Sequence, residues 1–144
     1  MVSSGLLFSE RKRVAVAIEL VTNPFLIVLD EPTSGLDSRA ALHLVKLLRR
    51  EAQSGKTVLC SVHQPSSELF SQFDRMIFMH EGAPIYSGPV TKLKPYLNRL
   101  NVDVPKYVNP ADLLTRIVVA PANHAAGLSI EKLVSKCKID LTKD

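Results

Sequence analysis

Short apolar runs alternate with helical patterns along most of this chain. Residues 25–29 form a continuous apolar run, which is typical of a parallel strand that is buried on both faces. Residues 57–62 form a second run rich in β-branched side chains, and a helical pattern bounded by turn residues separates the two runs. Because parallel strands require such a crossover, this order predicts an α/β fold with a parallel sheet whose ligands bind at the carboxyl ends of the strands.

Two amphipathic helices flank the first strand. We expect the first helix at residues 10–21 and the second at residues 38–53, with Asp37 or Ser38 as a suitable N-cap of the second. The expected buried stripes, which follow helical spacing, are Val14, Ile18 and Val21 in the first helix and Ala41, Leu44, Val45 and Leu48 in the second.

The second half of the chain continues the α/β pattern and then becomes less regular. Strands at residues 75–79 and 85–87 are expected to form an antiparallel hairpin that closes the edge of the sheet. Prolines within residues 103–121 weaken the pattern there. The helices expected in this half cover residues 66–73, 90–100 and 129–137.

Length and composition indicate one folded domain without a membrane segment of its own. The 144 residues are 46% hydrophobic and 22% charged, which is enough apolar content for a core and too much for a disordered tail. No apolar run approaches the roughly 18 residues of a membrane helix. Charges at residues 10–13 also interrupt the apolar start before it can form a signal peptide. We therefore expect that the chain by itself neither spans a membrane nor enters the secretory route.

The charge balance and the cysteines argue against two further classes of protein. The net charge of +4 is a mild excess and aromatic residues make up only 6%, so we expect no nucleic-acid partner. Cys60 and Cys137 lie far apart, without a second cysteine pair or a histidine at ligand spacing. This pattern argues against a zinc site and a disulfide scaffold, and it fits a reducing cytosolic environment.

Two acidic residues follow the first expected strand. Asp30 and Glu31 stand where a parallel sheet holds its ligands. A carboxylate there suits Mg²⁺, which takes oxygen ligands and keeps waters and nucleotide phosphates in its shell. A neighbouring carboxylate can orient or deprotonate the attacking water in phosphoryl transfer. Taken alone, such a pair is more often an ordinary strand exit that carries two solvated acids.

Two further features follow in order. Residues 34–37 form a tight turn that leads into the Asp37 cap, which alone indicates only a loop and a helix start. His63 follows the second strand, so it leaves the sheet at the same end as Asp30 and Glu31. A single histidine is usually a surface residue. The acidic pair, the turn and the histidine together, in this order and at this spacing, form a much more specific pattern than any one of them alone.

The run Asp30-Glu31-Pro32-Thr33-Ser34-Gly35-Leu36-Asp37 resembles the Walker B and D-loop segment of ABC ATPases, in which a helix, a strand and a switch histidine follow. The resemblance covers residues 9–118 and implies the parallel sheet of a P-loop NTPase, here incomplete, with an antiparallel edge hairpin and a helical C-terminal part. Finer features are similar to the G subfamily of half-transporters, which includes the insect white pigment type. These features are Glu10-Arg11-Lys12-Arg13, Glu19-Leu20-Val21, His63-Gln64-Pro65, Tyr86-Ser87-Gly88 and Asn109-Pro110-Ala111-Asp112.

The resemblance implies roles, cofactors and partners. Asp30 resembles the aspartate associated with Mg²⁺, Glu31 the catalytic base, and His63 the histidine that senses the γ-phosphate of ATP. The implied activity is ATP hydrolysis coupled to export of lipids, sterols, pigments or drugs, at the cytosolic face of a membrane. The implied partners are a second nucleotide-binding domain, in a homodimer or heterodimer, and the membrane domains of a transporter. The residues that resemble the D-loop at the interface of paired domains are Ser34, Gly35 and Asp37.

Two departures from the family pattern limit what the isolated chain can do. No G-x-x-x-x-G-K-[ST] loop occurs, and residues 55–57 precede an expected strand instead of opening a helix. Ser3 and Gly5 stand where the family's signature contacts the γ-phosphate held by the partner, but an inserted four-residue segment displaces them from the Glu10 helix. That displacement is about 5 Å, or one helical turn, and it leaves Ser9 to cap the helix. We expect the isolated chain to bind ATP weakly or not at all.

The sequence thus divides into a divergent start at residues 1–8, the C-terminal part of an ABC nucleotide-binding domain at residues 9–118, and a short helical or poorly ordered tail at residues 119–144. Without the first half of that domain, we expect residues 25–29 to present an open apolar edge. Two functions remain open. The chain is either a partial ATPase subunit of a G-subfamily transporter or a non-catalytic module that pairs with and regulates a full half-transporter.

Overall fold

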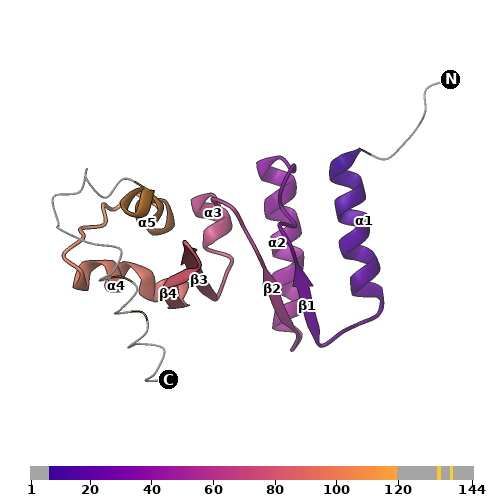
Figure 1. Cartoon of the computed structure of the whole chain (residues 1–144). Coiled ribbons are helices and arrows are strands. Elements are labelled where there is room, and N and C mark those ends of the chain that lie inside the picture. Colours follow the sequence, from indigo (N-terminus) through magenta and orange to yellow (C-terminus); the bar gives the residue numbers. More distant parts are fainter. Residues whose placement is uncertain (1–6, 120–132, 134–136, 138–144) are drawn as a thin grey trace. The chain divides into compact units, whose positions relative to one another are not determined.

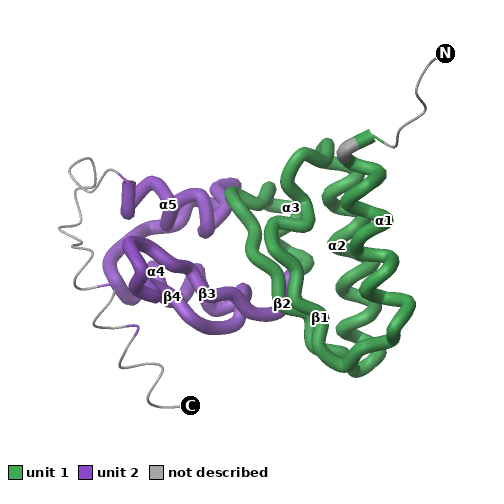
Figure 2. The backbone as a smooth tube through the Cα atoms, turned by 45° about the vertical axis from the view of Figure 1, so that its right-hand side comes forward, with its two compact units in different colours: residues 1–72 green, residues 73–144 purple. Residues whose placement is uncertain are grey.

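The computed structural model describes residues 7–119 together with Leu133 and Cys137 (Figure 1). The chain divides into two compact units, residues 1–72 and residues 73–144 (Figure 2). The described strands form two separate two-stranded sheets, β1 with β2 and β3 with β4. Each unit therefore contains one small sheet of its own.

The first unit is built around a parallel pair of strands. β1 (Leu26–Leu29) and β2 (Thr57–Cys60) pair along their whole length, and the crossover helix α2 (Ser38–Gln53) packs on β2. The Asp37 carboxylate accepts a hydrogen bond from the Ala40 N–H at 2.8 Å, so Asp37 is the N-cap of α2. The short helix α3 (Ser67–Phe70) also packs against α2. The buried stripe predicted for α2 is confirmed at all of its positions, Ala41, Leu44, Val45 and Leu48.

The start of the first helix differs from the prediction. α1 (Phe8–Val21) has Leu7 as its N-cap residue, and the Leu7 N–H donates a hydrogen bond to the Glu10 carboxylate at 2.9 Å. Glu10 in the first turn thus satisfies an N–H that has no partner within the helix. The expectation that Ser9 caps this helix is wrong, because Ser9 lies inside its first turn.

The buried side of α1 is also not the predicted one. Val14, Ile18 and Val21 are exposed, whereas Val16 is 5% exposed and Leu20 packs beside it against α2 and the sheet. The helix carries apolar side chains on opposite sides, so its periodicity alone does not identify the side that faces the sheet. The contact with β1 selects the Val16 side.

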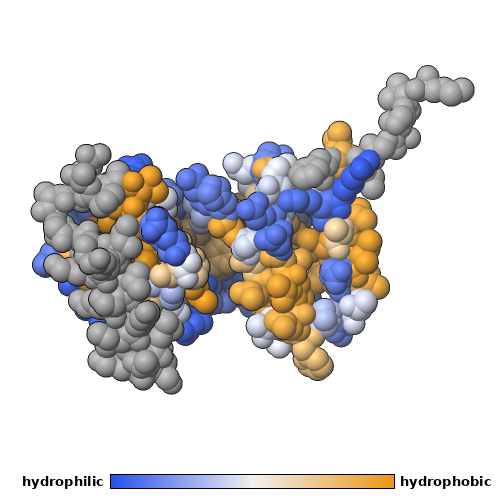
Figure 3. Space-filling model, viewed as in Figure 1, coloured by the Kyte–Doolittle hydropathy of each residue, from blue (hydrophilic) through white to orange (hydrophobic). Residues whose placement is uncertain are grey.

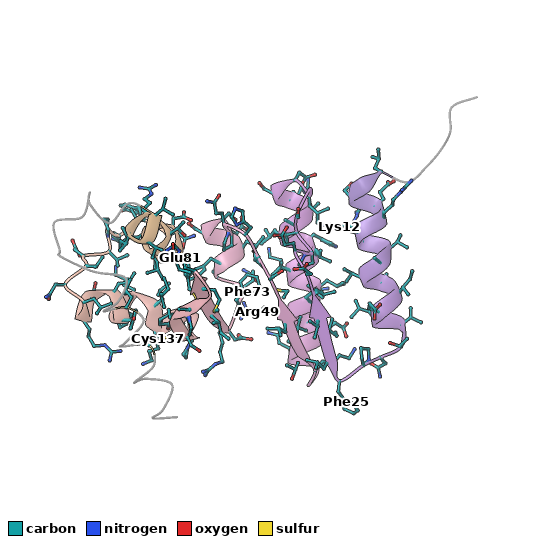
Figure 4. All side chains as sticks on the ribbon, in the orientation of Figure 1. Lys12, Phe25, Arg49, Phe73, Glu81 and Cys137 are labelled. Atoms are coloured by element: carbon teal, nitrogen blue, oxygen red, sulfur yellow. The ribbon has the colours of Figure 1, made fainter. Side chains whose placement is uncertain are left out.

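One face of the β1–β2 sheet is covered and the other is open. Ile27 is only 2% exposed, whereas Leu26, Val28 and Leu59 are 56%, 63% and 57% exposed on the opposite face. Figure 3 shows this face as a continuous hydrophobic area over β1 and β2. Successive side chains of a strand point to opposite faces, and α1 and α2 both pack on the same one. The prediction that residues 25–29 are buried on both faces is therefore wrong, and Phe25 projects into solvent before β1 (Figure 4).

The second unit begins with the predicted antiparallel hairpin. β3 (Arg75–His80) and β4 (Ala83–Pro89) are joined by a two-residue turn in which Glu81 and Gly82 have φ values of 47° and 76°. Because this short turn joins two adjacent segments of the chain, β3 and β4 form their hydrogen bonds with each other without a third strand. The hairpin does not pair with β1 or β2, and the expectation that it closes the edge of the parallel sheet is wrong.

A helix that the sequence patterns did not predict completes the described part of the second unit. α5 (Pro110–Val119) starts after Asn109, whose side-chain oxygen accepts a hydrogen bond from the Ala111 N–H at 3.0 Å. Proline suits the first helical position because its missing N–H would have no partner within the helix. The helix expected at residues 90–100 is a 3₁₀ turn, η1 (Val90–Lys92), followed by α4 (Leu93–Arg99).

The second unit contains a group of tightly buried side chains. The Tyr96 hydroxyl donates a hydrogen bond to the Ile85 carbonyl at 3.0 Å, and the rings of Tyr86 and Tyr96 lie 5.1 Å apart. The helix expected at residues 129–137 lies outside the described residues, except for Leu133 and Cys137, which are helical and buried. The large side chains of the described residues that are less than 2% exposed all belong to this unit: Ile85, Leu93, Leu97, Leu114, Ile117 and Leu133.

Candidate functional site

The carboxyl ends of β1 and β2 bring Asp30, Glu31 and Ser61 together. Asp30 directly follows β1, and Ser61 directly follows β2. Because the paired strands end at the same level, these two residues lie opposite each other. The Ser61 hydroxyl donates a hydrogen bond to the Asp30 carboxylate at 2.6 Å and accepts one from the Glu31 N–H at 2.8 Å. A single hydroxyl therefore connects both acidic residues. The side chains of Asp30 and Glu31 are exposed and open to a ligand from solvent.

Glu31 has an unusual backbone conformation. Its φ of 42° lies in the left-handed region, which is uncommon for residues other than glycine. Lys12 of α1 donates a hydrogen bond from Nζ to the Glu31 carbonyl at 2.8 Å, and the Ser34 N–H donates to the same oxygen at 3.1 Å. Figure 4 shows Lys12 extending from α1 toward the end of β1. Ser61 and Lys12 thus hold the two backbone groups of Glu31, and such support allows a strained conformation to persist.

The loop after Glu31 is anchored by apolar residues and exposes its polar ones. Pro32 is buried, and Leu36 packs against the cluster formed by Val16, Leu44 and Leu48. Ser34, Gly35 and Asp37 are exposed, and Gly35 has a φ of 73°, a conformation that glycine adopts without strain. The side chain of Asp37 caps its own helix, so this D-loop candidate also has a structural role.

His63 follows β2 at the same edge of the sheet. It is exposed, and Gln64 directly after it has a φ of 45°, although a residue before proline normally adopts an extended conformation. This strained turn redirects the chain toward the Ser66 N-cap of α3, whose hydroxyl accepts from the Leu69 N–H. The structure therefore places His63 at the edge that carries Asp30 and Glu31.

The residues at this edge fit Mg²⁺ better than a metal that needs a full set of protein ligands. Among the residues that the structure describes, no group of three or more histidine, cysteine, aspartate or glutamate side chains forms a metal site. Mg²⁺ commonly takes one or two carboxylates and completes its shell with water and phosphate oxygens. Asp30 is suited to this role because it is exposed and directly follows β1. Ser3 and Gly5, the candidate phosphate contacts, lie outside the described residues.

Sequence reasoning did not identify two residues that contact the site. Ser61 is the residue after β2 and lies opposite Asp30, so the strand pairing itself indicates it once the register is known. Lys12 lies one helical turn before Val16, on the side of α1 that faces the sheet. Lys12 was not identified because the sequence analysis predicted the opposite side of α1 as the one that faces the sheet.

Comparison with known proteins places the chain in a family. Residues 63–136 match a family model described as an ABC-2 type transporter, which is a model of the membrane domain. The chain belongs to the ABC-2 type transporter family. Within its described residues, no helix combines the length and the apolar character needed to cross a bilayer.

The relatives of this ABC-2 type family member are G-family ABC transporters. ABC transporter G family member 14 of Arabidopsis thaliana is 44% identical over 110 residues, which are 76% of this chain and 17% of the relative. ATP-binding cassette sub-family G member 8 of Homo sapiens is 45% identical over 108 residues, which are 75% of this chain and 16% of the relative. The chain thus spans 16–17% of the length of these relatives, and the predicted resemblance to the G subfamily is confirmed.

Solved structures with a similar fold are ATP-binding cassettes. The ADP conformation of an ATP-binding cassette of an ABC transporter superposes with a TM-score of 0.53 at 26% identity, over 63% of this chain and 37% of that one. The cbiO1 protein of Clostridium perfringens, part of the ABC transporter complex cbiONQ, gives a TM-score of 0.54 at 31% identity, over 67% and 38%. These likenesses confirm the predicted α/β fold of an ABC ATPase, although the two sheets are separate in this chain.

Proposed function

We propose that this chain forms the C-terminal part of the nucleotide-binding domain of a G-subfamily ABC transporter of the white pigment type. The whole protein hydrolyses ATP to export a lipid-like or other hydrophobic substrate, and this segment lies at the cytosolic face of the membrane. One observation carries the proposal: Asp30 and Glu31 are joined through Ser61 at the carboxyl end of two parallel strands, in a chain whose relatives are G-family transporters. Residues 9–118 are assigned to this domain, between a divergent start and a short tail.

The residues at the edge of the sheet have separate tasks in this proposal. The Asp30 carboxylate holds Mg²⁺, and the metal, when bound, neutralises charge on the phosphates of ATP. The Glu31 carboxylate orients the attacking water and accepts its proton. His63 donates a hydrogen bond toward the γ-phosphate. The exposed loop residues Ser34, Gly35 and Asp37 face a second nucleotide-binding domain, in a homodimer or heterodimer, while membrane domains complete the transporter.

In this proposal, ATP hydrolysis also requires a phosphate-binding loop, which residues 1–144 do not contain. The backbone N–H groups and the lysine of a G-x-x-x-x-G-K-[ST] loop normally hold the phosphates, and the sequence contains no such loop. We therefore expect Mg-ATP to bind this chain weakly or not at all in a calorimetric titration. Micromolar affinity that disappears in Asp30→Asn would overturn this expectation.

The proposal is tested in a chimera. The matching 110-residue segment of the Arabidopsis relative is replaced by that of this chain, and ATPase activity is measured in the purified full-length protein. Glu31→Gln should lower kcat about 100-fold or more, which is the usual contribution of a general base. Glu19→Gln, on the exposed side of α1, is the matched control and should leave kcat unchanged. An active chimera in which Glu31→Gln keeps full activity would contradict the assignment.

A second candidate function is a non-catalytic module that pairs with a full half-transporter and regulates it. Two observations favour it: the polar loop residues Ser34 and Gly35 are exposed, and one face of the β1–β2 sheet is apolar and open. In this case the loop of residues 34–37 and the region of His63 form the interface.

Co-purification distinguishes the second function from the first. A tagged copy of this chain is expressed with a full-length half-transporter that carries no replacement, and the complex is isolated in detergent. Binding that is lost in Ser34→Arg, at an exposed position of the loop, and kept in His43→Arg on the exposed side of α2, supports the module. Absence of a complex under conditions in which the chain is folded would exclude it.

A further inference from the structure

We infer that Ser61 is a positioning residue for the two acidic residues of the proposed nucleotide site. The inference rests on the proposed function, because it assigns to Asp30 and Glu31 the work of holding Mg²⁺ and activating water. Ser61 is contributed by the segment after β2, whereas both acidic residues follow β1. The Ser61 side chain therefore links the end of β2 to both acidic residues that follow β1.

The direction of the two hydrogen bonds follows from the groups involved. A backbone N–H only donates, so the Ser61 oxygen must accept from Glu31, over 2.8 Å. The single hydroxyl proton of Ser61 is then left for the Asp30 carboxylate, over 2.6 Å. This short distance is typical of a hydroxyl that donates to an ionised carboxylate. The arrangement orients one oxygen of Asp30 and leaves the second for a ligand.

The same hydroxyl stabilises the backbone of Glu31. With a φ of 42°, Glu31 is in a conformation that persists only when its surroundings hold it. Ser61 holds the N–H, and Lys12 holds the carbonyl at 2.8 Å. Without the Ser61 hydroxyl, the N–H loses its partner and the residue can relax toward an ordinary helical or extended conformation. The carboxylate of Glu31 would then move away from the water that it is proposed to orient.

The chain offers a set of matched variants. Ser61→Ala removes the hydroxyl, while Ser61→Thr keeps it, and Ser61 is exposed, so the additional methyl group has space. Ser54→Ala removes a comparable exposed hydroxyl that donates to the Glu51 carbonyl at 2.7 Å, away from the site. Comparing these variants separates the loss of this particular hydroxyl from the general loss of a surface hydrogen bond.

The first measurement uses the full chain without nucleotide. Amide hydrogen exchange, followed by NMR, should become roughly 10-fold faster at Glu31 in Ser61→Ala, which corresponds to the loss of one net hydrogen bond. Exchange at Glu31 should be unchanged in Ser61→Thr and Ser54→Ala. If exchange at Glu31 is the same in Ser61→Ala as in the unchanged chain, the inference is wrong, whatever the function of the site.

The second measurement uses the ATPase-active chimera. Ser61→Ala should lower kcat roughly 10-fold, because displacement of a catalytic group slows the chemical step, while KM for ATP stays nearly constant. Ser61→Thr should restore kcat, because threonine keeps the hydroxyl that contacts both acidic residues. If Glu31→Gln has no effect, the proposed function fails. If Glu31→Gln removes activity and Ser61→Ala has no effect, only this inference fails.

Discussion

The two units of this chain differ in how deeply each buries its most apolar side chains. In the second unit, Leu93, Leu97 and Leu114 are fully buried by a hairpin and helices that are close in sequence. In the first unit, Val28 and Leu59 lie on a sheet face that α1 and α2 leave open. The solved cassettes are more than twice as long as the part that superposes, 37–38% of each chain. Both units also keep an open strand face, since Ile77 and Met79 on β3 are 62% and 54% exposed. The difference is therefore that the second unit adds a group of fully buried side chains, whereas the sheet of the first unit is covered on one face only.

The largest difference is expected for truncation of a leucine in each unit. Leu114→Ala in the second unit should lower the free energy of unfolding by about 2–5 kcal/mol, because it removes buried contacts and leaves a cavity. Leu59→Ala on the open face should change it by less than about 0.5 kcal/mol. Urea unfolding followed by circular dichroism measures both values, and tyrosine fluorescence follows the second unit, which contains all three tyrosines. Similar losses in the two variants would show that the open face is covered.

The helix caps provide a second comparison. Asn109 caps α5 and is 5% exposed, so Asn109→Ala leaves a buried N–H without that partner and should cost about 2 kcal/mol. Asp37 caps α2 at an exposed position, and Asp37→Ala should cost about 1 kcal/mol. Thermal unfolding measures both, with Asp37→Asn as a control that retains the oxygen acceptor. A larger loss for Asp37→Ala than for Asn109→Ala would contradict the role of burial.

Two neighbouring positions on β2, residues 59 and 60, allow the solvent accessibility of the two faces of the sheet to be compared. Burial raises the pKa of the Cys60 thiol, whereas Leu59 beside it is 57% exposed. A cysteine introduced by Leu59→Cys should therefore react with iodoacetamide roughly 10-fold faster at pH 8 than Cys60, as resolved by peptide mass spectrometry. Equal rates would show that the faces are equally accessible.

The raised pKa of Cys60 also has a consequence for stability at high pH. The folded state keeps the thiol proton above the ordinary value of 9.0, where the unfolded chain releases it. The contribution of Cys60 to stability is thus complete below pH 9.0 and decreases as the pH rises beyond it. Cys60→Ala should remove this part of the pH dependence in urea unfolding.

The smallest effect on folding is expected for a charge on the open face. Leu59→Lys should change the free energy of unfolding by less than about 0.5 kcal/mol while reducing self-association, because exposed apolar strands promote pairing between chains. Sedimentation velocity at several concentrations measures the association. Tyr107→Lys, at a side chain of the second unit that is 92% exposed, is the control and should leave association unchanged. An equal reduction in both variants would contradict a special role for the β1–β2 face.

Local chemistry in the sequence was sufficient to predict the elements around the site. Asp37 as an N-cap and the buried stripe from Ala41 to Leu48 depend on interactions within one helix, so their spacing identifies them. The shared edge of Asp30 and His63 follows from the parallel order of two strands. Asn109 and Pro110 carried a comparable start signal for α5, but the surrounding prolines obscured it.

Only the tertiary structure decided which apolar sides are covered and which residues support the acidic pair. The sequence of α1 is apolar on two sides, and packing against β1 chose Val16 over Ile18. The register of β1 and β2 brought Ser61 to Asp30, and the burial of the Val16 side directed Lys12 to Glu31. These contacts join residues distant in the chain, and a local pattern does not encode which distant partner a surface will meet. The sequence by itself therefore determined the order of elements and the candidate acidic residues, while strand register and helix packing determined how those residues are held.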